Sequence, residues 1–165
     1  MTHDELVDYV MAMDGRMSRM LKVGTVEDVT PGEQKARIRM GGSDDEPFLG
    51  PSVPYSQAAV GLTVHTPVTK GQQMLMISPG GDFRQGGLIP LTFSDENKSP
   101  SAKGDENVVT FGQATITLRG NQLNVKLGGL NVDLSTDGAT ISIGGTTFKL
   151  SSGGIEATAS KYDWK

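Results

Sequence analysis

Cysteine and histidine, two side chains that often act as nucleophile or base near neutral pH, are absent or rare in this chain of 165 residues. It contains no cysteine, so disulfides and thiol catalysis are excluded, which suits assembly in a reducing cytosol. The two histidines, His3 and His65, lie far apart in the sequence, and no Ser–His–Asp grouping accompanies either of them. We interpret His65 as a structural or surface histidine, and we predict no catalytic site and no cofactor.

Two short motifs resemble ligand-binding loops, but each lacks a residue that the ligand requires. The acidic run SDDEP (43–47) has neither the alternating oxygen ligands nor the glycine of a calcium loop. The run SPGGD (78–82) lacks the lysine of a phosphate-binding loop. We therefore interpret 43–47 as a solvated loop and 78–82 as a turn, and we predict no metal site.

Two aromatic side chains, Tyr162 and Trp164, stand in the C-terminal segment 160–165. Aromatic residues with a polar end can contact a membrane or another protein, and they can equally pack together as a cap. The residues alone leave these alternatives open. Tyr162 and Trp164 are therefore candidates for a contact at the tip of the molecule.

The elements that would position such residues fall into two parts of different composition. All eight prolines lie at or before Pro100, and all eight methionines lie at or before Met76. Between the parts, the run SDENKSPSAKGDEN (94–107) is polar and interrupted by proline, which is typical of a linker. We predict a linker over 94–113. The net charge of −4 and the lack of a basic run predict no nucleic-acid partner.

The segment 1–22 has the periodicity of an amphipathic helix. Its apolar residues are spaced by 4, 3, 4 and 3 positions, which places them on one face; they are Leu6, Val10, Met13, Met17 and Met20. Gly15 interrupts the pattern and predicts a break. The helix either packs against its own domain or docks on a partner. Acidic residues near the N-terminus and the lack of a long apolar run predict a soluble protein without an export signal.

The segment 23–93 has the pattern of a small all-β domain. Turn motifs separate short runs of alternating residues, and no helical stretch lies between them, so we predict an OB-like β-barrel. Its only candidate bases for binding an oligonucleotide are Arg37, Arg39 and Arg84, which are too few for a phosphate-binding surface. The expected strands are 23–30, 35–41, 72–79 and 86–93, with a weaker one near 51–57.

The segment 114–159 contains six runs of about five residues in which apolar and polar residues alternate. Each run is typical of a strand with one buried face, and glycines separate the runs. The central inward residues are spaced by 9, 7, 9, 7 and 9 positions, so the repeat is two strands in 16 residues. These residues are Ile116, Val125, Val132, Ile141, Phe148 and Ala157, and Leu150 also points inward.

A single chain cannot bury this aliphatic face, so we expect three copies to wrap around a common axis. The fold class that follows is all-β: an N-terminal helix, an OB-like barrel and an intertwined triple-stranded β-helix formed by a homotrimer. Strand edges would pair between chains, with six strands on each face and a length of roughly 30 Å. Residues decrease in size from Phe148 to Ala157 and from Leu150 to Ala159, which predicts that the needle narrows.

The whole chain resembles the baseplate assembly protein V family, the central spikes of contractile phage tails and related injection machines. The run KVGTVEDVTPGEQKARIRMGG (22–42) is similar to the family's opening barrel strands. The run KGQQMLMISPGGDFRQGGLIPLTFSDEN (70–97) is similar to its later ones, and the run at 114–159 is similar to its β-helix.

The resemblance implies a homotrimeric spike in the virion baseplate, made in the host cytoplasm. Its OB domain would attach to a hub protein, and its needle would pierce the host outer membrane on sheath contraction. Many family members bind iron at the apex through a His-x-His motif, which this chain lacks. We therefore predict no metal at the C-terminus, and we favour a separate tip protein over a cap made by Tyr162 and Trp164.

Two functions of other classes remain as alternatives. A trimeric tail fibre or adhesin fragment that binds a surface ligand would be favoured by an aromatic-rich distal head. A polysaccharide depolymerase built on a β-helix would line a groove with acidic residues, whereas the outward positions here are mainly Thr, Ser, Asn and Lys. We therefore expect a structural spike rather than an enzyme.

Overall fold

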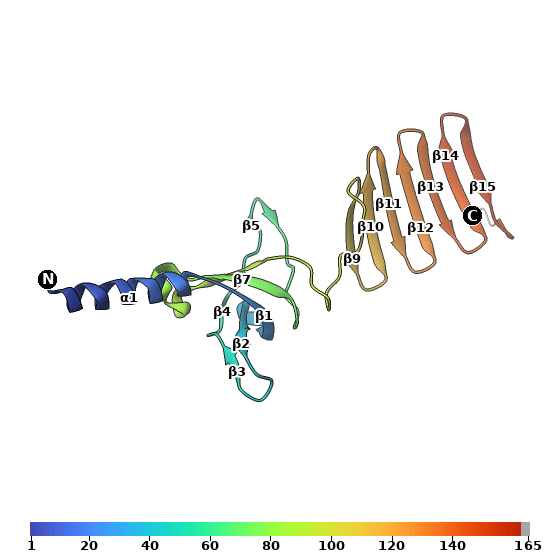
Figure 1. Ribbon diagram of the computed structural model, residues 1–165. Helices are drawn as coiled ribbons and strands as arrows, with labels where there is room; N and C mark the ends of the chain where they lie inside the picture. The colour runs from blue at the N-terminus through green and yellow to red at the C-terminus, as the bar shows by residue number, and fades with distance from the viewer. Residues whose placement is uncertain (163–165) are drawn as a thin grey trace. The chain divides into compact units, whose positions relative to one another are not determined.

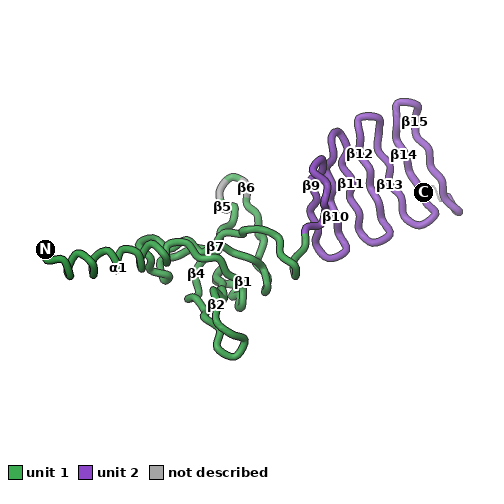
Figure 2. The backbone as a smooth tube through the Cα atoms, in the orientation of Figure 1, with its two compact units in different colours: residues 1–98 green, residues 99–165 purple. Residues whose placement is uncertain are grey.

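The structure is a computed structural model that describes residues 1–162, and it divides the chain into two compact units, 1–98 and 99–165 (Figure 2). It is mostly β, with one N-terminal helix and antiparallel sheets, in agreement with the predicted all-β class (Figure 1). The division between the units falls inside the predicted linker, 94–113.

The N-terminal segment forms one continuous helix, α1 (His3–Met20). A capping box begins it, in which the Thr2 amide donates to the Glu5 carboxylate at 2.6 Å and the Glu5 amide donates to the Thr2 hydroxyl at 3.3 Å. The predicted break at Gly15 is wrong, because one glycine costs a helix only about 1 kcal/mol. The helix ends two residues before the predicted boundary, since Leu21 already belongs to the first strand.

Six strands of unit 1 form one antiparallel sheet. The sheet has the order β3-β2-β1-β7-β8, and β4 also pairs with β2. Tyr55, which follows β4, forms a parallel bridge with Leu88 of β8, and the Ser56 amide donates to the Leu88 carbonyl at 2.8 Å. The strands are β1 (Leu21–Thr30), β2 (Lys35–Gly42), β3 (Pro47–Leu49), β4 (Val53–Pro54), β7 (Gln73–Ile77) and β8 (Gly87–Pro90).

Unit 1 encloses its own hydrophobic core. A β-bulge at Glu27 shifts the register between Val26 and Asp28, and such bulges bend a strand enough to help a sheet curl. The core residues alternate along each strand, as the period of two requires; they are Val26, Ala36, Ile38, Val53, Tyr55, Val68, Met74, Met76 and Leu88. The four clearest predicted strands of this unit are confirmed, although β8 ends at Pro90, three residues early.

The remaining segments of unit 1 are short. A two-stranded hairpin joins β5 (Ala59–Val60) to β6 (Leu62–Thr63), and 3₁₀ turns span Pro31–Glu33, Pro79–Gly81 and Phe83–Gln85. The predicted turn at 78–82 is confirmed by the second of these 3₁₀ turns. The acidic run 43–47 is exposed, as expected for a solvated loop.

Unit 2 is a single antiparallel sheet of seven strands that follow one another in chain order (Figure 1). Two-residue turns join them, and the turns begin every eight residues, so the predicted repeat of two strands in 16 residues is confirmed. The strands are β9 (Asn107–Phe111), β10 (Ala114–Arg119), β11 (Gln122–Leu127), β12 (Leu130–Ser135), β13 (Gly138–Ile143), β14 (Thr146–Ser151) and β15 (Gly154–Thr158).

One predicted boundary in this unit is wrong. The linker 94–113 is too long, because β9 occupies 107–111 and pairs with β10. The sheet therefore has one strand more than the six that were predicted. The last strand, β15, ends at Thr158, one residue before the predicted end of the needle segment 114–159.

The strands of unit 2 also pair differently from the intertwined arrangement that we expected. Each interior strand pairs on both sides with strands of its own chain, so its edges are not left for other chains. The turn glycines explain the difference. Four turns begin with a glycine whose φ lies between 54° and 57°, as a type II′ turn requires, and such a turn returns the chain to the adjacent position in the same sheet. These glycines are Gly112, Gly120, Gly128 and Gly144.

Gly138 at the start of β13 provides a test of this register. We expect Gly138→Ala to destabilise unit 2 by about 1–3 kcal/mol, because its φ of +150° suits only glycine. A Cβ there would also lie 2.1 Å from the Leu150 carbonyl oxygen. In the control, Gly129→Ala, the new Cβ meets no atom within 4 Å. Thermal unfolding followed by circular dichroism measures both variants, and equal melting temperatures would contradict the register.

Candidate assembly interface

The predicted core residues of the repeat lie in one row across the sheet of unit 2. Each is the direct cross-strand partner of the next, because the six turns have equal length. β9 adds Val109 at one end of this central row, opposite Ile116. The central row is Val109, Ile116, Val125, Val132, Ile141, Phe148 and Ala157.

Two further apolar rows flank the central row on the same face. One contains Phe111, Ala114, Leu127, Leu130, Ile143 and Thr146. The other contains Leu118, Leu123, Leu134, Ala139, Leu150 and Ile155. The cross-strand partner of Leu150 is Ile155 and not Ala159, so the predicted decrease in side-chain size along this row is wrong. In the central row, Phe148 does face the smaller Ala157.

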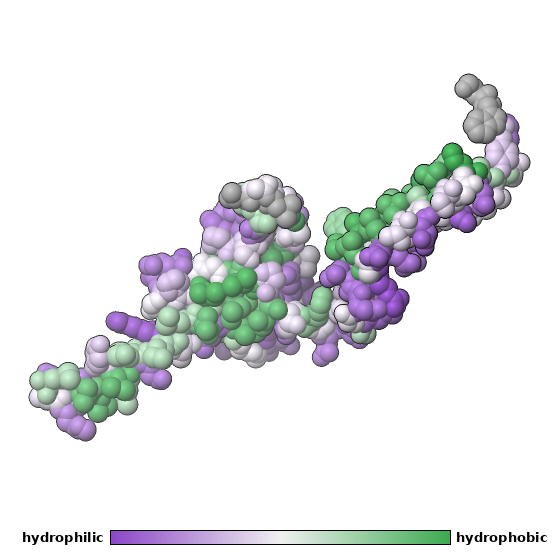
Figure 3. Space-filling model, turned by 90° about the horizontal axis from the view of Figure 1, so that it is seen from above, coloured by the Kyte–Doolittle hydropathy of each residue, from purple (hydrophilic) through white to green (hydrophobic). Residues whose placement is uncertain are grey.

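This apolar face is uncovered in the single chain. Among residues 99–162 none is buried, and every buried hydrophobic residue belongs to unit 1. The exposed fraction is 44% for Ile141, 46% for Phe148 and 66% for Ile155. Figure 3 shows hydrophobic residues gathered along one side of this sheet and hydrophilic residues along the other. A continuous apolar face of this extent marks an interaction surface.

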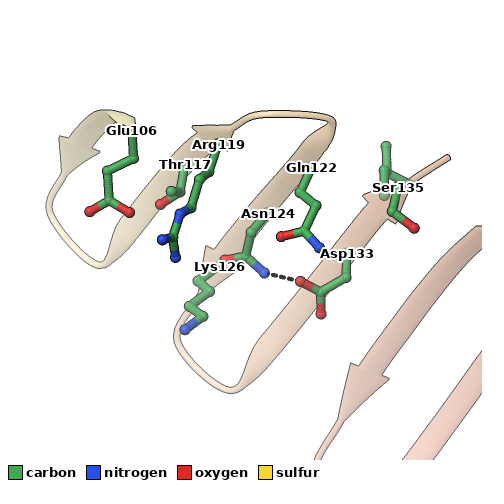
Figure 4. Close-up of a pocket in the computed structure, with 9 residues that line it drawn as sticks. Glu106, Thr117, Arg119, Gln122, Asn124, Lys126, Asp133 and Ser135 are labelled. Atoms are coloured by element: carbon green, nitrogen blue, oxygen red, sulfur yellow. Dashed lines mark hydrogen bonds between the residues drawn. The ribbon is translucent and has the colours of Figure 1, made fainter. Parts of the chain in front are cut away.

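The opposite face of the sheet is polar. It includes a shallow depression of about 460 Å³, and eight of the nine residues that line it are polar or charged (Figure 4). Asn124 donates to both Asn131 and Asp133 across neighbouring strands. Arg119 contacts Asp105 at 2.7 Å, and this hydrogen bond and the guanidinium charge lower the pKa of the Asp105 carboxyl. Groups of this kind suit contact with water.

The chain folds back on itself after β15. The Tyr162 hydroxyl donates to the Ala157 carbonyl at 2.5 Å and accepts from the Ala159 amide at 3.0 Å. A further strand would use these backbone groups, so Tyr162 covers part of the free edge of β15. The candidate Trp164 lies outside the described residues.

Unit 1 carries two exposed apolar surfaces of its own. None of the residues of α1, all of which are described, is buried, although its last turns contact the turn at Pro79–Gly81, where the Arg19 side chain donates to the Gly81 carbonyl at 3.3 Å. The second surface, the outer strip, is formed by Leu21, Val23, Ile77 and Ile89 on the outside of β1, β7 and β8.

The polar residues singled out from the sequence do not come together. His3 begins α1, and His65 is exposed beyond β6. Arg39 is paired with Asp44 at 2.8 Å, and Arg84 is paired with Asp82. In the part of the chain that the structure describes, no three His, Asp or Glu side chains are close enough to hold a metal ion.

Neither a protein-family model nor a curated protein matches this sequence. Among the described residues, no helix is long and apolar enough to cross a membrane.

Val109 and Phe111 belong to the apolar face but were assigned to the linker from the sequence. Two signals could have identified them. Val109 precedes Ile116 by seven residues, which continues the alternation of seven and nine, and Gly112 precedes Gly120 by the eight residues that separate successive turns. The polar run before them concealed the first strand.

We expect Phe148→Asp to prevent stable assembly of unit 2, because a carboxylate buried without a partner costs about 3–5 kcal/mol in each chain. Thr147→Asp is the matched control, since Thr147 points to the polar face between Ser142 and Thr158. Size-exclusion chromatography and thermal unfolding measure both variants. If the two variants behave alike, the apolar face is not buried in the assembled protein.

We expect Tyr162→Phe to expose the last strand edge. The variant loses both hydrogen bonds of the hydroxyl, and loss of the one from the Ala159 amide, worth about 1 kcal/mol, should raise the hydrogen-exchange rate of that amide roughly fivefold. Lys161→Ala serves as the control. An unchanged rate at Ala159 would show that Tyr162 does not cover this edge in solution.

Proposed function

We propose that this chain is the central spike of a contractile phage tail, or of a related injection particle, and that it works as a homotrimer. The observation that carries this proposal is the uncovered apolar face of unit 2, which continues across all seven strands. A lone sheet with one apolar face in water does not bury enough surface to offset the entropy of ordering it. In our proposal, the apolar face of unit 2 is buried against the same face of other copies of the chain.

The dimensions of the sheet fit three copies. A strand of six residues is about 20 Å long, so in a triangular prism with sides of this length the axis lies roughly 6 Å from each face. That distance is close to half of the spacing of about 10 Å between packed sheets. The central row would then lie at the axis, where space is most limited, and its residues are mainly valine and isoleucine, whereas the flanking rows are richer in leucine.

Each face of the proposed prism is the sheet of one chain, rather than a sheet interleaved from three chains. Seven strands at a spacing of about 4.8 Å give a length of roughly 30 Å. The fold proposed for the other unit is an OB-like barrel. Its support is the ring β1-β2-β4-β8-β7, closed by the parallel bridge of Tyr55 with Leu88.

Such a prism suits a mechanical role. The strands run across the axis, so their backbone hydrogen bonds run along it, in the direction in which the sheath would drive the spike. The three sheets share one core and must separate together, which makes unfolding slow. The polar outer face allows the prism to move through water and past the headgroups of the host outer membrane.

The proposed partners are assigned to surfaces that lie outside the apolar face of unit 2. The outer strip of Leu21, Val23, Ile77 and Ile89 is the surface that we assign to a baseplate hub protein. A separate tip protein would dock on the segment 155–165. We propose no nucleic-acid partner, because Arg37 donates to the Gly50 carbonyl while Arg39 and Arg84 are paired with acids.

The assembly state tests the proposal first. We expect sedimentation equilibrium of the full chain to give a mass three times the 17.5 kDa of one chain. A monomer would contradict the proposed cover of the apolar face, and a dimer would replace the prism with a two-sheet sandwich.

The location in the particle tests the function. We expect gold-labelled antibodies against this protein to mark the centre of the baseplate in electron micrographs of contractile particles from the organism that encodes it. Labels on peripheral fibres would favour an adhesin and overturn the spike. A matched antibody against the sheath protein, which should mark the tail shaft, serves as the control.

A further inference from the structure

We propose that the helix α1 is a second contact between copies of this chain, in which three helices associate as a short parallel coiled coil. The contact surface, the seam, is Leu6, Val10, Met13, Met17 and Met20. This inference rests on the proposed homotrimer, but it concerns a surface that the needle does not use.

The spacing of the seam is that of a coiled coil. Its steps of 4, 3, 4 and 3 average 3.5 residues, the repeat that keeps one narrow stripe facing a partner in supercoiled helices. In heptad notation Val10 and Met17 occupy a positions, and Leu6, Met13 and Met20 occupy d positions. Val7 and Met11, at e and b positions, are also exposed and widen the apolar face on one side of this stripe.

The seam is open along the whole helix. The exposed fractions of its side chains run from 41% for Met20 to 65% for Met17. Figure 1 shows that most of α1 extends away from the strands of its own unit. A helix of this length with few tertiary contacts is only marginally stable in water. Burial of its uncovered apolar stripe against a partner would stabilise it.

The attachment of α1 to its own unit leaves the seam free. The Arg19 side chain donates to the Gly81 carbonyl at 3.3 Å, and a Cβ added to Gly81 would lie 2.7 Å from the carbonyl oxygen of Arg16. At about 100° per residue, Arg16 lies roughly 80° and Arg19 roughly 140° around the helix from the middle of the seam. The contact therefore fixes the last turns of α1 through a different side.

The residues that flank the seam suit a parallel arrangement. Tyr9 at a g position would face Asp14 at the following e position of the next helix, where the phenol can donate to the carboxylate. The acidic residues Asp4 and Asp8 occupy b and f positions, away from the seam. Like charges therefore do not meet across it.

The seam does not by itself determine the number of helices. Methionine side chains are flexible and adapt to several packings, and the seam is short. The trimeric sheets would set both the number and the common direction of the helices. Because the trimeric sheets hold the three helices near one another, the helices have a high effective concentration. Even a weak interaction along the seam is then enough for them to associate.

A single cysteine can test the seam, because the chain has none of its own. We expect a short bismaleimide to link chains of the full-length Met13→Cys variant, in which three thiols would meet at a d position. Because one linker joins two chains of a threefold assembly, up to about two thirds of the protein should migrate as a linked dimer. The matched control is Asp8→Cys, an exposed f position of the same helix, which should give little linked product.

Sedimentation of the same two variants separates the possible failures. If both are trimers and Met13→Cys is linked no more than Asp8→Cys, the helix bundle is wrong and the seam is left for another protein, such as the hub. If both are monomers and neither is linked, the trimer is wrong as well. Linking of Met13→Cys in a trimeric protein supports both proposals.

Discussion

The structure depends on one constraint, which is that the sheet of unit 2 has an apolar face and none of the described residues of that unit, 99–162, is buried. Among the residues whose burial is described, the buried hydrophobic ones all belong to unit 1, whereas the central row of unit 2, from Val109 to Ala157, is half-buried or exposed. Apolar burial is the main favourable term in folding, so in the proposed trimer this sheet would gain its stability from association rather than from its own packing. Under that proposal, assembly is part of how this chain folds.

The constraint also explains the regularity of the repeat. Equal strands and two-residue turns keep three apolar rows in line over the whole sheet, and a slip by one residue would move every apolar side chain to the polar face. Glycine at the start of four turns gives the geometry that permits such tight returns. In the proposed trimer the sheet would have to match identical copies of itself, which leaves little tolerance for irregular loops, and each of its six turns has two residues.

Much of this arrangement follows from the sequence, because alternation and spacing are local properties. The set from Ile116 to Ala157 shares one row because its spacing alternates between seven and nine residues. Properties that depend on competition between local and tertiary effects were harder to predict. The helical preference of the residues around Gly15 is larger than the cost of one glycine, so α1 continues through it. The strand β9 follows a polar run that was assigned to a linker. Strand pairing within one chain depends on turn conformations, which glycine content alone does not specify.

The two units therefore differ in how their folding depends on concentration. Unit 1 has a closed core, with Ile38, Met74 and Met76 fully buried, so one chain can fold it alone. In our proposal unit 2 needs partners, because its exposed rows and terminal edges would otherwise promote aggregation. Tyr162 limits this hazard by occupying backbone groups beside the last strand. If α1 joins the copies at one end of the chain, the three sheets associate within one linked assembly. The apolar face of unit 2, which is the surface most prone to aggregation, would then be buried quickly.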